Sequence, residues 1–180
     1  MSTYNKMFTE NYLTLASGFL SQCHLETEVS LSDYNHCLSK GANQQPLKRL
    51  PPHQFLYGLV HTESKTLVSV LHLVYLYGCM GGAEPGPQHI LQWSYAYTLD
   101  DKKYRRQGCS LALRLASMIW AQQQGWNYIN SVPLPGAHSE PLLKSLGFTP
   151  FYDGDDDIYY IYQLSKTNLS GLAKERLMRK

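Results

Sequence analysis

The segment Thr66–Tyr77 restricts the folds open to this chain more than any other. A strand turns alternate side chains to opposite faces of a sheet, and here both sets are apolar. The first set is Val68, Val70, Val74 and Leu76, and the second is Leu67, Leu71, Leu73 and Tyr75. Such a strand lies inside a sheet that is covered on both sides. The polar tetrapeptide Thr62–Lys65 separates it from the apolar run Phe55–His61, which predicts an antiparallel hairpin.

Helical and strand patterns follow one another along the rest of the chain. Apolar residues at helical spacing predict helices over about residues 8–22, 31–40, 111–124 and 139–146. Strands are predicted over 89–98, 126–132, 148–152 and 158–164. No linker or repeat interrupts this order, so we expect residues 1–180 to form a single α/β (α+β) domain, a mixed sheet with helices on both faces. The tail 167–180 is either a helix or a frayed terminus.

Composition narrows the classes of function. The formal net charge is only +2, which does not favour an extended nucleic-acid interface. The N-terminal ten residues contain no apolar signal-peptide core, and the most apolar stretch is too short to span a membrane. The four cysteines and seven histidines lack the spacing of a metal site or of a disulfide framework. We therefore expect a cytoplasmic protein that binds neither a metal nor a membrane.

The stretch Tyr97–Ser110 carries the clearest chemical pattern. It reads as a strand end, a short charged loop and a helix start that contains Gly108. The first amide groups of a helix are unpaired and carry the positive end of its dipole, so they bind anions. Gly108 allows a close approach to the backbone, and Arg105 and Arg106 add cationic donors. A diphosphate suits this arrangement.

The same stretch resembles the acyl-CoA-binding motif of the GCN5-related N-acetyltransferases (GNAT), Arg/Gln-x-x-Gly-x-Gly/Ala. Arg105 and Gly108 match the motif, and Ser110 replaces its last Gly or Ala. The later Leu146-Gly147-Phe148 resembles the end of the family's next helix, and the likeness covers about residues 55–165. It implies a mostly antiparallel sheet with one splayed parallel strand pair, and acetyl-CoA as co-substrate.

The resemblance also implies which residues bind the donor. The strand end before the motif would pair with the pantetheine arm, and the start of the helix would hold the diphosphate. The following strand would line the arm through Asn130 and Ser131, unless these are ordinary strand-end polar groups. The donor-binding residues implied are Tyr97, Thr98, Leu99, Arg105, Arg106, Gln107, Gly108, Cys109, Ser110 and Asn130.

The resemblance identifies the catalytic residues less clearly than the donor-binding residues. Many family members have a general-acid tyrosine four residues before the glycine of Leu-Gly-Phe, and here that position is Leu143. We consider Tyr152 as the substitute acid. The alternatives are that solvent supplies the proton and that Tyr152 is only an aromatic residue at a strand edge. His72 is the candidate base, with Tyr95 and Tyr97, and its ordinary role is that of a buried core histidine.

The activity that follows is transfer of an acetyl group from acetyl-CoA to a primary amine in a ternary complex. The acceptor would be a small molecule or a protein, and the enzyme a monomer or a homodimer. The acidic turn Asp153–Asp157 would attract a cationic amine or is a solvated hairpin turn. The missing tyrosine favours an alternative, a weak or inactive CoA-binding or regulatory module. A third hypothesis is nucleic-acid binding through Lys102, Lys103, Arg105 and Arg106.

Overall fold

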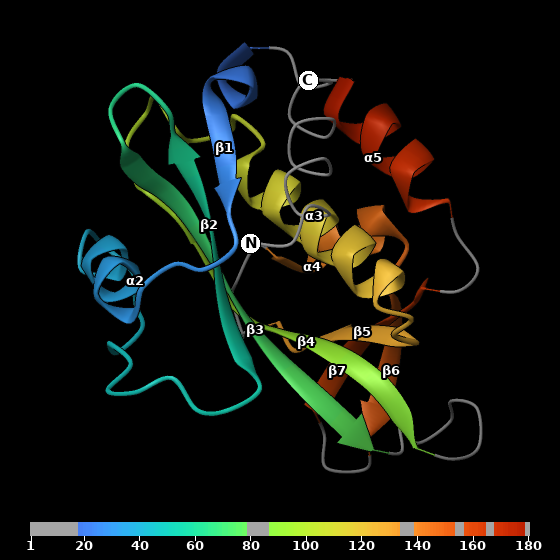
Figure 1. Ribbon diagram of the computed structural model, residues 1–180. Coiled ribbons are helices and arrows are strands. Elements are labelled where there is room, and N and C mark those ends of the chain that lie inside the picture. The colour runs from blue at the N-terminus through green and yellow to red at the C-terminus, as the bar shows by residue number, and fades with distance from the viewer. Residues whose placement is uncertain (1–17, 79–86, 134–138, 154–156, 165–167, 179–180) are drawn as a thin grey trace.

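The computed structural model describes residues 18–78, 87–133, 139–153, 157–164 and 168–178. They form a seven-stranded sheet with helices on both of its faces (Figure 1). The strands are β1 Cys23–Glu26, β2 Gln54–His61, β3 Thr66–Gly78, β4 Gln88–Thr98, β5 Tyr128–Ser131, β6 Thr149–Asp153 and β7 Asp157–Gln163. The helices are α2 Leu31–Leu38, α3 Cys109–Gln123, α4 Ser139–Leu146 and α5 Leu169–Met178, preceded by a 3₁₀ turn, Gly18–Gln22.

The strand order is β1-β2-β3-β4-β5-β7-β6, and every neighbouring pair is antiparallel except β4 and β5. Figure 1 shows α2 on one face of the sheet and α3, α4 and α5 on the other. The inner residues of β3, from Val68 to Leu73, are buried between these two layers. The prediction from the doubly apolar Thr66–Tyr77 is therefore confirmed, and so is the mixed sheet with one parallel pair.

The α2 face has a small core of its own. Ser30 caps α2, because its Oγ accepts a hydrogen bond from the Asp33 amide at 3.0 Å. Tyr34, Cys37 and Leu38 then pack against β2 and β3. This confirms the helix predicted over 31–40.

Two local predictions differ from the structure. Residues 18–22 of the helix expected over 8–22 form a 3₁₀ turn, and the rest of that helix lies outside the described residues. Cys23–Glu26 then forms β1, which was not predicted because four residues are too few to show a strand pattern. The tail is not frayed over 169–178. There α5 packs on α3 and buries Leu169, Ala173 and Leu177.

The β1–β2–β3 pairing depends on Gly58, which is buried between Glu26 of β1 and Val70 of β3. A Cβ at this position would lie 2.7 Å from Val29 Cγ2 and would also clash with Leu67 Cδ1. Gly58→Ala should therefore lower the free energy of unfolding by about 1–3 kcal/mol. Urea denaturation tests this, with Gly78→Ala as control because nothing lies within 4 Å of its Cβ position. Equal losses in the two variants would contradict the packing argument.

Candidate functional site

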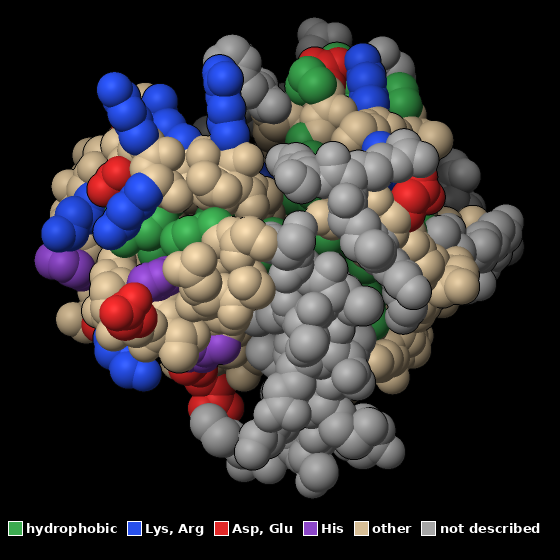
Figure 2. Space-filling view, turned by 90° about the horizontal axis from the view of Figure 1, so that it is seen from above, with side chains coloured by type: hydrophobic (Ala, Val, Ile, Leu, Met, Phe, Trp, Pro, Cys, Tyr) green, Lys and Arg blue, Asp and Glu red, His purple; other side chains and the backbone are tan. Residues whose placement is uncertain are grey.

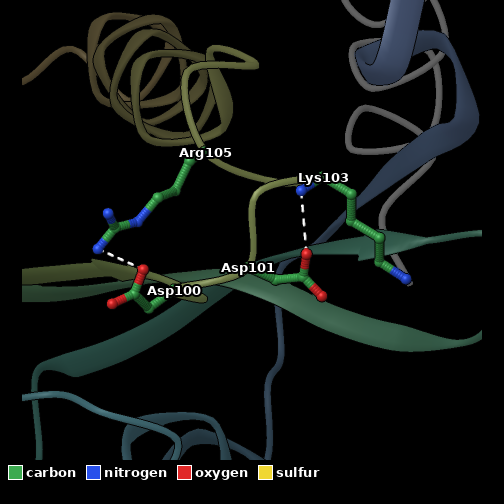
Figure 3. A network of polar contacts seen from close by, with 4 residues as sticks. All are labelled: Asp100, Asp101, Lys103 and Arg105. Atoms are coloured by element: carbon green, nitrogen blue, oxygen red, sulfur yellow. Dashed lines mark hydrogen bonds and ion pairs between the residues drawn. The ribbon is translucent and has the colours of Figure 1, made fainter.

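The loop between β4 and α3 is shaped by Asp101. Its carbonyl accepts hydrogen bonds from the amides of Tyr104 and Arg105 at 2.9 and 3.0 Å. Its carboxylate accepts the Lys103 amide at 3.0 Å, as Figure 3 shows. The buried Tyr104 ring fixes the middle of the loop, because it packs against Phe19 with the ring centroids 5.5 Å apart. An aspartate and a buried tyrosine thus hold the loop in one compact turn.

Gly108 ends the loop and begins α3 in a left-handed conformation, with φ 82° and ψ 10°. The Ala112 amide donates to the Gly108 carbonyl at 2.8 Å, so the amides of Ser110 and Leu111 precede the first intrahelical bond. Within the described part of the chain, no side chain caps this helix start. Fifteen residues of aligned peptide dipoles therefore end at an uncapped N-terminus, which is an anion-binding geometry.

The two loop arginines are exposed and differ in their backbone. Arg105 forms an ion pair with Asp100, and its side chain is 61% exposed. Figure 3 shows it turned back toward that aspartate. Arg106 adopts a left-handed φ of 58°, which helps to close the turn before Gly108. Arg105 must therefore leave Asp100 before it can contact an anion at the helix start.

The ladder between β4 and β5 ends partway along β4. They pair from Ile90–Tyr128 to Trp93–Ser131, where the described ladder ends. At the same point the β3–β4 register shifts, so that Ser94 is an extra residue, a β-bulge, between Trp93 and Tyr95. The end of β4 beyond the bulge, Tyr95–Thr98, pairs with β3 on one side and has no β5 partner on the other. This unpaired stretch of β4 is the gap between β4 and β5, and it agrees with the splayed parallel pair that the resemblance implied.

The predicted pantetheine-binding residues border this gap. Thr98 Oγ1 and Tyr97 O both contact Ser69 Oγ of β3, at 2.8 and 3.0 Å, and the Leu99 amide donates to Val68. These contacts hold the strand end in place from the β3 side.

Two polar residues of β5, Asn130 and Ser131, lie at the end of its ladder with β4. Asn130 is buried, and its Oδ1 has no hydrogen-bond partner among the described residues. Ser131 Oγ reaches the carbonyl of Trp93 at 3.5 Å and so bridges the two strands where they separate. Of the other motif residues, Gln107 is exposed and Cys109 is buried, with its thiol directed to the Tyr104 carbonyl at 3.7 Å. Cys109 could therefore offer a ligand only its backbone.

His72 is on β3, across from Tyr95 of β4, and is buried on the α2 face. Its Nε2 donates to Gln54 Oε1 at 2.7 Å, which leaves Nδ1 as the accepting nitrogen. Nδ1 is buried and has no partner among the described residues. Burial lowers the pKa of His72, so the imidazole is neutral near pH 7. It has the protonation state of a base but lies away from bulk solvent.

The two positions considered for a proton donor, Leu143 and Tyr152, belong to different elements. Leu143 on α4 is fully buried in the core. Tyr152 is on β6, which β7 separates from β5, and its side chain lies outside the described residues.

Another tyrosine has a described hydroxyl group and lies beside β5, and the sequence analysis did not identify it. Tyr160 of β7 pairs with Ser131 of β5, and its hydroxyl donates to Glu140 of α4 at 2.6 Å. That hydrogen bond raises the pKa of Tyr160, so the phenol keeps its proton at neutral pH. Only the sheet order shows that Tyr160 borders β5.

A pocket of about 580 Å³ lies on the α2 face, and Leu99 is the donor-motif residue in its wall. Its walls include Glu26 and Asp33 as well as Lys40 and Lys65. Burial raises the pKa of Cys37 in its wall to about 11, so this cysteine is a neutral thiol at pH 7. The pocket wall therefore carries mixed charge and a neutral thiol.

Other kinds of site have little support in the described residues. They contain no group of three His, Cys, Asp or Glu side chains that could hold a metal ion. None of their helices is both long and apolar enough to cross a membrane. Figure 2 shows basic side chains interspersed with acidic and histidine side chains on the described part of the upper face.

Comparison with known proteins identifies the fold. No family model and no curated protein matches the sequence. One of the matching solved structures is a mutant of the toxin AtaT bound to the C-terminus of the antitoxin AtaR and to acetyl-CoA. It has a TM-score of 0.58 and 13% sequence identity, and the match covers 88% of this chain and 99% of that chain. The ribosomal-protein-S18-alanine N-acetyltransferase of Escherichia coli matches with TM-score 0.59 and 14% identity over 81% and 96%. An acetyltransferase of the GNAT family from Staphylococcus aureus Mu50 matches with TM-score 0.58 and 12% identity over 79% and 99%. The chain therefore has the GNAT fold.

Proposed function

We propose, from its GNAT fold, that this chain is an acyltransferase that moves an acetyl group from acetyl-CoA to a primary amine within a ternary complex. The observation that carries the proposal is the meeting of two features, the uncapped N-terminus of α3 and the gap between β4 and β5. A helix start binds a diphosphate, and an unpaired strand edge binds an extended amide chain. Acetyl-CoA contains both groups in one molecule.

The donor then lies along the residues that the motif implied. Its diphosphate contacts the backbone between Gly108 and Ser110, and its pantetheine arm pairs with β4 from Thr98 toward Tyr95. The thioester reaches the bulge at Ser94, where the backbone leaves the regular ladder. A backbone N–H at this bulge would stabilise the oxyanion that forms on the thioester carbonyl.

The reaction requires two proton transfers. The amine nitrogen attacks the thioester carbon, the carbon–sulfur bond breaks, and CoA leaves as a thiolate. The amine proton passes to His72 Nδ1 or to water, and the thiolate takes a proton from Tyr160 or, as an alternative, from Tyr152 or solvent. We favour Tyr160 because it borders β5 and packs against α4, the helix in which the family's acid is expected.

The acceptor is proposed only as a class, a primary amine of a small molecule or of a protein. One matched structure is an acetyltransferase for an alanine of ribosomal protein S18, and another is a toxin seen with acetyl-CoA. The test incubates the protein with acetyl-CoA and a panel of polyamines, amino sugars and peptides with free N-termini. Mass spectrometry should find a product heavier by one acetyl group, and free thiol should appear in equal amount. Binding of CoA without any product would favour the alternative, a CoA-binding regulatory module, which the buried Leu143 at the acid position supports.

Arg105→Ala should raise the KM for acetyl-CoA about threefold to tenfold and leave kcat nearly unchanged. The contact is to a phosphate that does not react, so it stabilises ground state and transition state alike. The effect is modest because Arg105 is exposed and must first leave Asp100. Steady-state kinetics measures both constants. Asp100→Asn is the matched variant and should lower the KM, since it releases Arg105. A large fall in kcat with an unchanged KM would place Arg105 at the chemistry instead.

A further inference from the structure

α3 contains one charged residue where its neighbours are apolar. Arg114 interrupts the run Leu111–Ala121, which otherwise consists of apolar residues and Ser117. The helix faces the core, and Arg114 is only 7% exposed. A buried arginine normally has an acidic or backbone partner, so its surroundings require an explanation.

The Arg114 guanidinium makes one aromatic contact and one side-chain hydrogen bond among the described residues. The guanidinium carbon lies 4.8 Å from the centroid of the Trp93 ring, which is a cation–π contact. Nε donates to Ser110 Oγ at 3.4 Å. Nη1 is buried and has no hydrogen-bond partner among the described residues. The side chain thus uses one face and one nitrogen and leaves a buried donor unused.

The charge of Arg114 is not neutralised by the described part of the chain. Burial lowers its pKa to about 10, so the guanidinium is still ionised at pH 7. The ion pairs among described residues are Arg105–Asp100 and Lys144–Glu140, and neither involves Arg114. A buried charge without a counter-charge is unfavourable, and the Trp93 ring offsets only part of that cost. An anion bound here would remove the rest.

The position of this guanidinium joins the two halves of the donor site. Helical side chains run back toward the N-terminus, and that of Arg114 reaches Ser110 in the first turn of α3. Its other contact, Trp93, is the last residue of β4 that pairs with β5 before the bulge. The guanidinium therefore contacts one residue at the helix start and one residue at the point where the β4–β5 ladder ends.

We propose that Arg114 binds an anionic oxygen of the acyl donor, an inference that rests on the proposed function. Ser110 then acts as a positioning residue, because its hydroxyl accepts Arg114 Nε and orients the guanidinium. This accounts for the serine at the place where the motif has Gly or Ala. Such an oxygen belongs either to a phosphate of CoA or to the terminal carboxylate of a dicarboxylic acyl group.

The test is titration calorimetry of wild type and Arg114→Met with CoA, acetyl-CoA and succinyl-CoA. If the anion is a phosphate of CoA, Arg114→Met should weaken binding of all three ligands about 30-fold or more. If it is the acyl carboxylate, the loss should be confined to succinyl-CoA. Either result supports the proposal. Equal affinities of Arg114→Met and wild type for all three ligands would overturn it. Wild type that binds none of the three would overturn the proposed function as well, so the two failures are distinguishable.

Two further variants separate binding from folding. Methionine removes an uncompensated buried charge and keeps an unbranched chain, so Arg114→Met should melt no lower than wild type in the absence of ligand. Arg114→Lys retains the charge without the guanidinium plane and should show a smaller loss of affinity than Arg114→Met. The lysine variant tests the proposal if the methionine variant does not fold. Ser110→Ala should weaken binding less than Arg114→Met. A lysine variant with wild-type affinity alongside a weakened methionine variant would assign the effect to charge alone, which also supports the proposal.

Discussion

Gly108→Asp is expected to weaken CoA binding by at least about a hundredfold while the protein remains folded. The new carboxylate would lie at the start of α3, where the proposed site holds the diphosphate. Two like charges placed next to each other cost several kcal/mol of binding free energy. The same charge is favourable for the helix itself, since it faces the positive end of the dipole. Titration calorimetry with CoA measures the loss, and circular dichroism and thermal melting report on the fold.

Gly108→Asn is the matched control for this experiment. Gly108 has φ 82°, a conformation that asparagine and aspartate adopt more readily than other side chains. The two variants therefore share backbone strain and side-chain size and differ in charge. Asparagine should retain most of the CoA affinity that aspartate loses. Ser110→Asp adds a charge nearby on helical backbone and should reproduce the loss. Wild-type affinity in a folded Gly108→Asp protein would remove the diphosphate from the start of α3.

Tyr160→Phe is expected to lower kcat about a hundredfold and to leave the affinity for acetyl-CoA almost unchanged. A positioned general acid contributes a factor of this size or more. The substitution removes only the hydroxyl that donates to Glu140, and the ring continues to pack in the core. Single-turnover kinetics with the best acceptor from the amine panel measures the effect on chemistry apart from product release.

Tyr152→Phe is the matched control, because it removes the same atom from the strand at the sheet edge. Its kcat should remain near that of wild type. A loss confined to Tyr152→Phe would assign proton transfer to Tyr152 instead. Near-wild-type turnover in both variants would leave solvent, or a group on the acceptor, as the proton source. If Tyr160 is the general acid, kcat falls at high pH as its phenol loses the proton. The hydrogen bond to Glu140 raises the pKa of Tyr160, so this fall lies above the ordinary tyrosine range. Tyr160→Phe should abolish it.

Short-range patterns were sufficient to predict most of the architecture. The two apolar faces of Thr66–Tyr77 require a covered inner strand, because a strand exposed on either side would place leucine and valine in water. The spacing of the apolar residues and glycines near 108 and 125 predicted α3, and both glycines have positive φ in the structure. The donor motif depends on contiguous residues, so the sequence alone brings its loop and helix start together.

Contacts between distant segments decided what the sequence could not. Tyr160 borders β5 because the sheet order places β7 between β5 and β6, and no local pattern encodes strand order. Arg114 appears in the sequence as one basic residue in an amphipathic helix. Only packing against Trp93, a residue of a different element, makes it a buried and unpaired charge. The sequence thus determined which groups the chain possesses, and the tertiary structure decided which of them are removed from water.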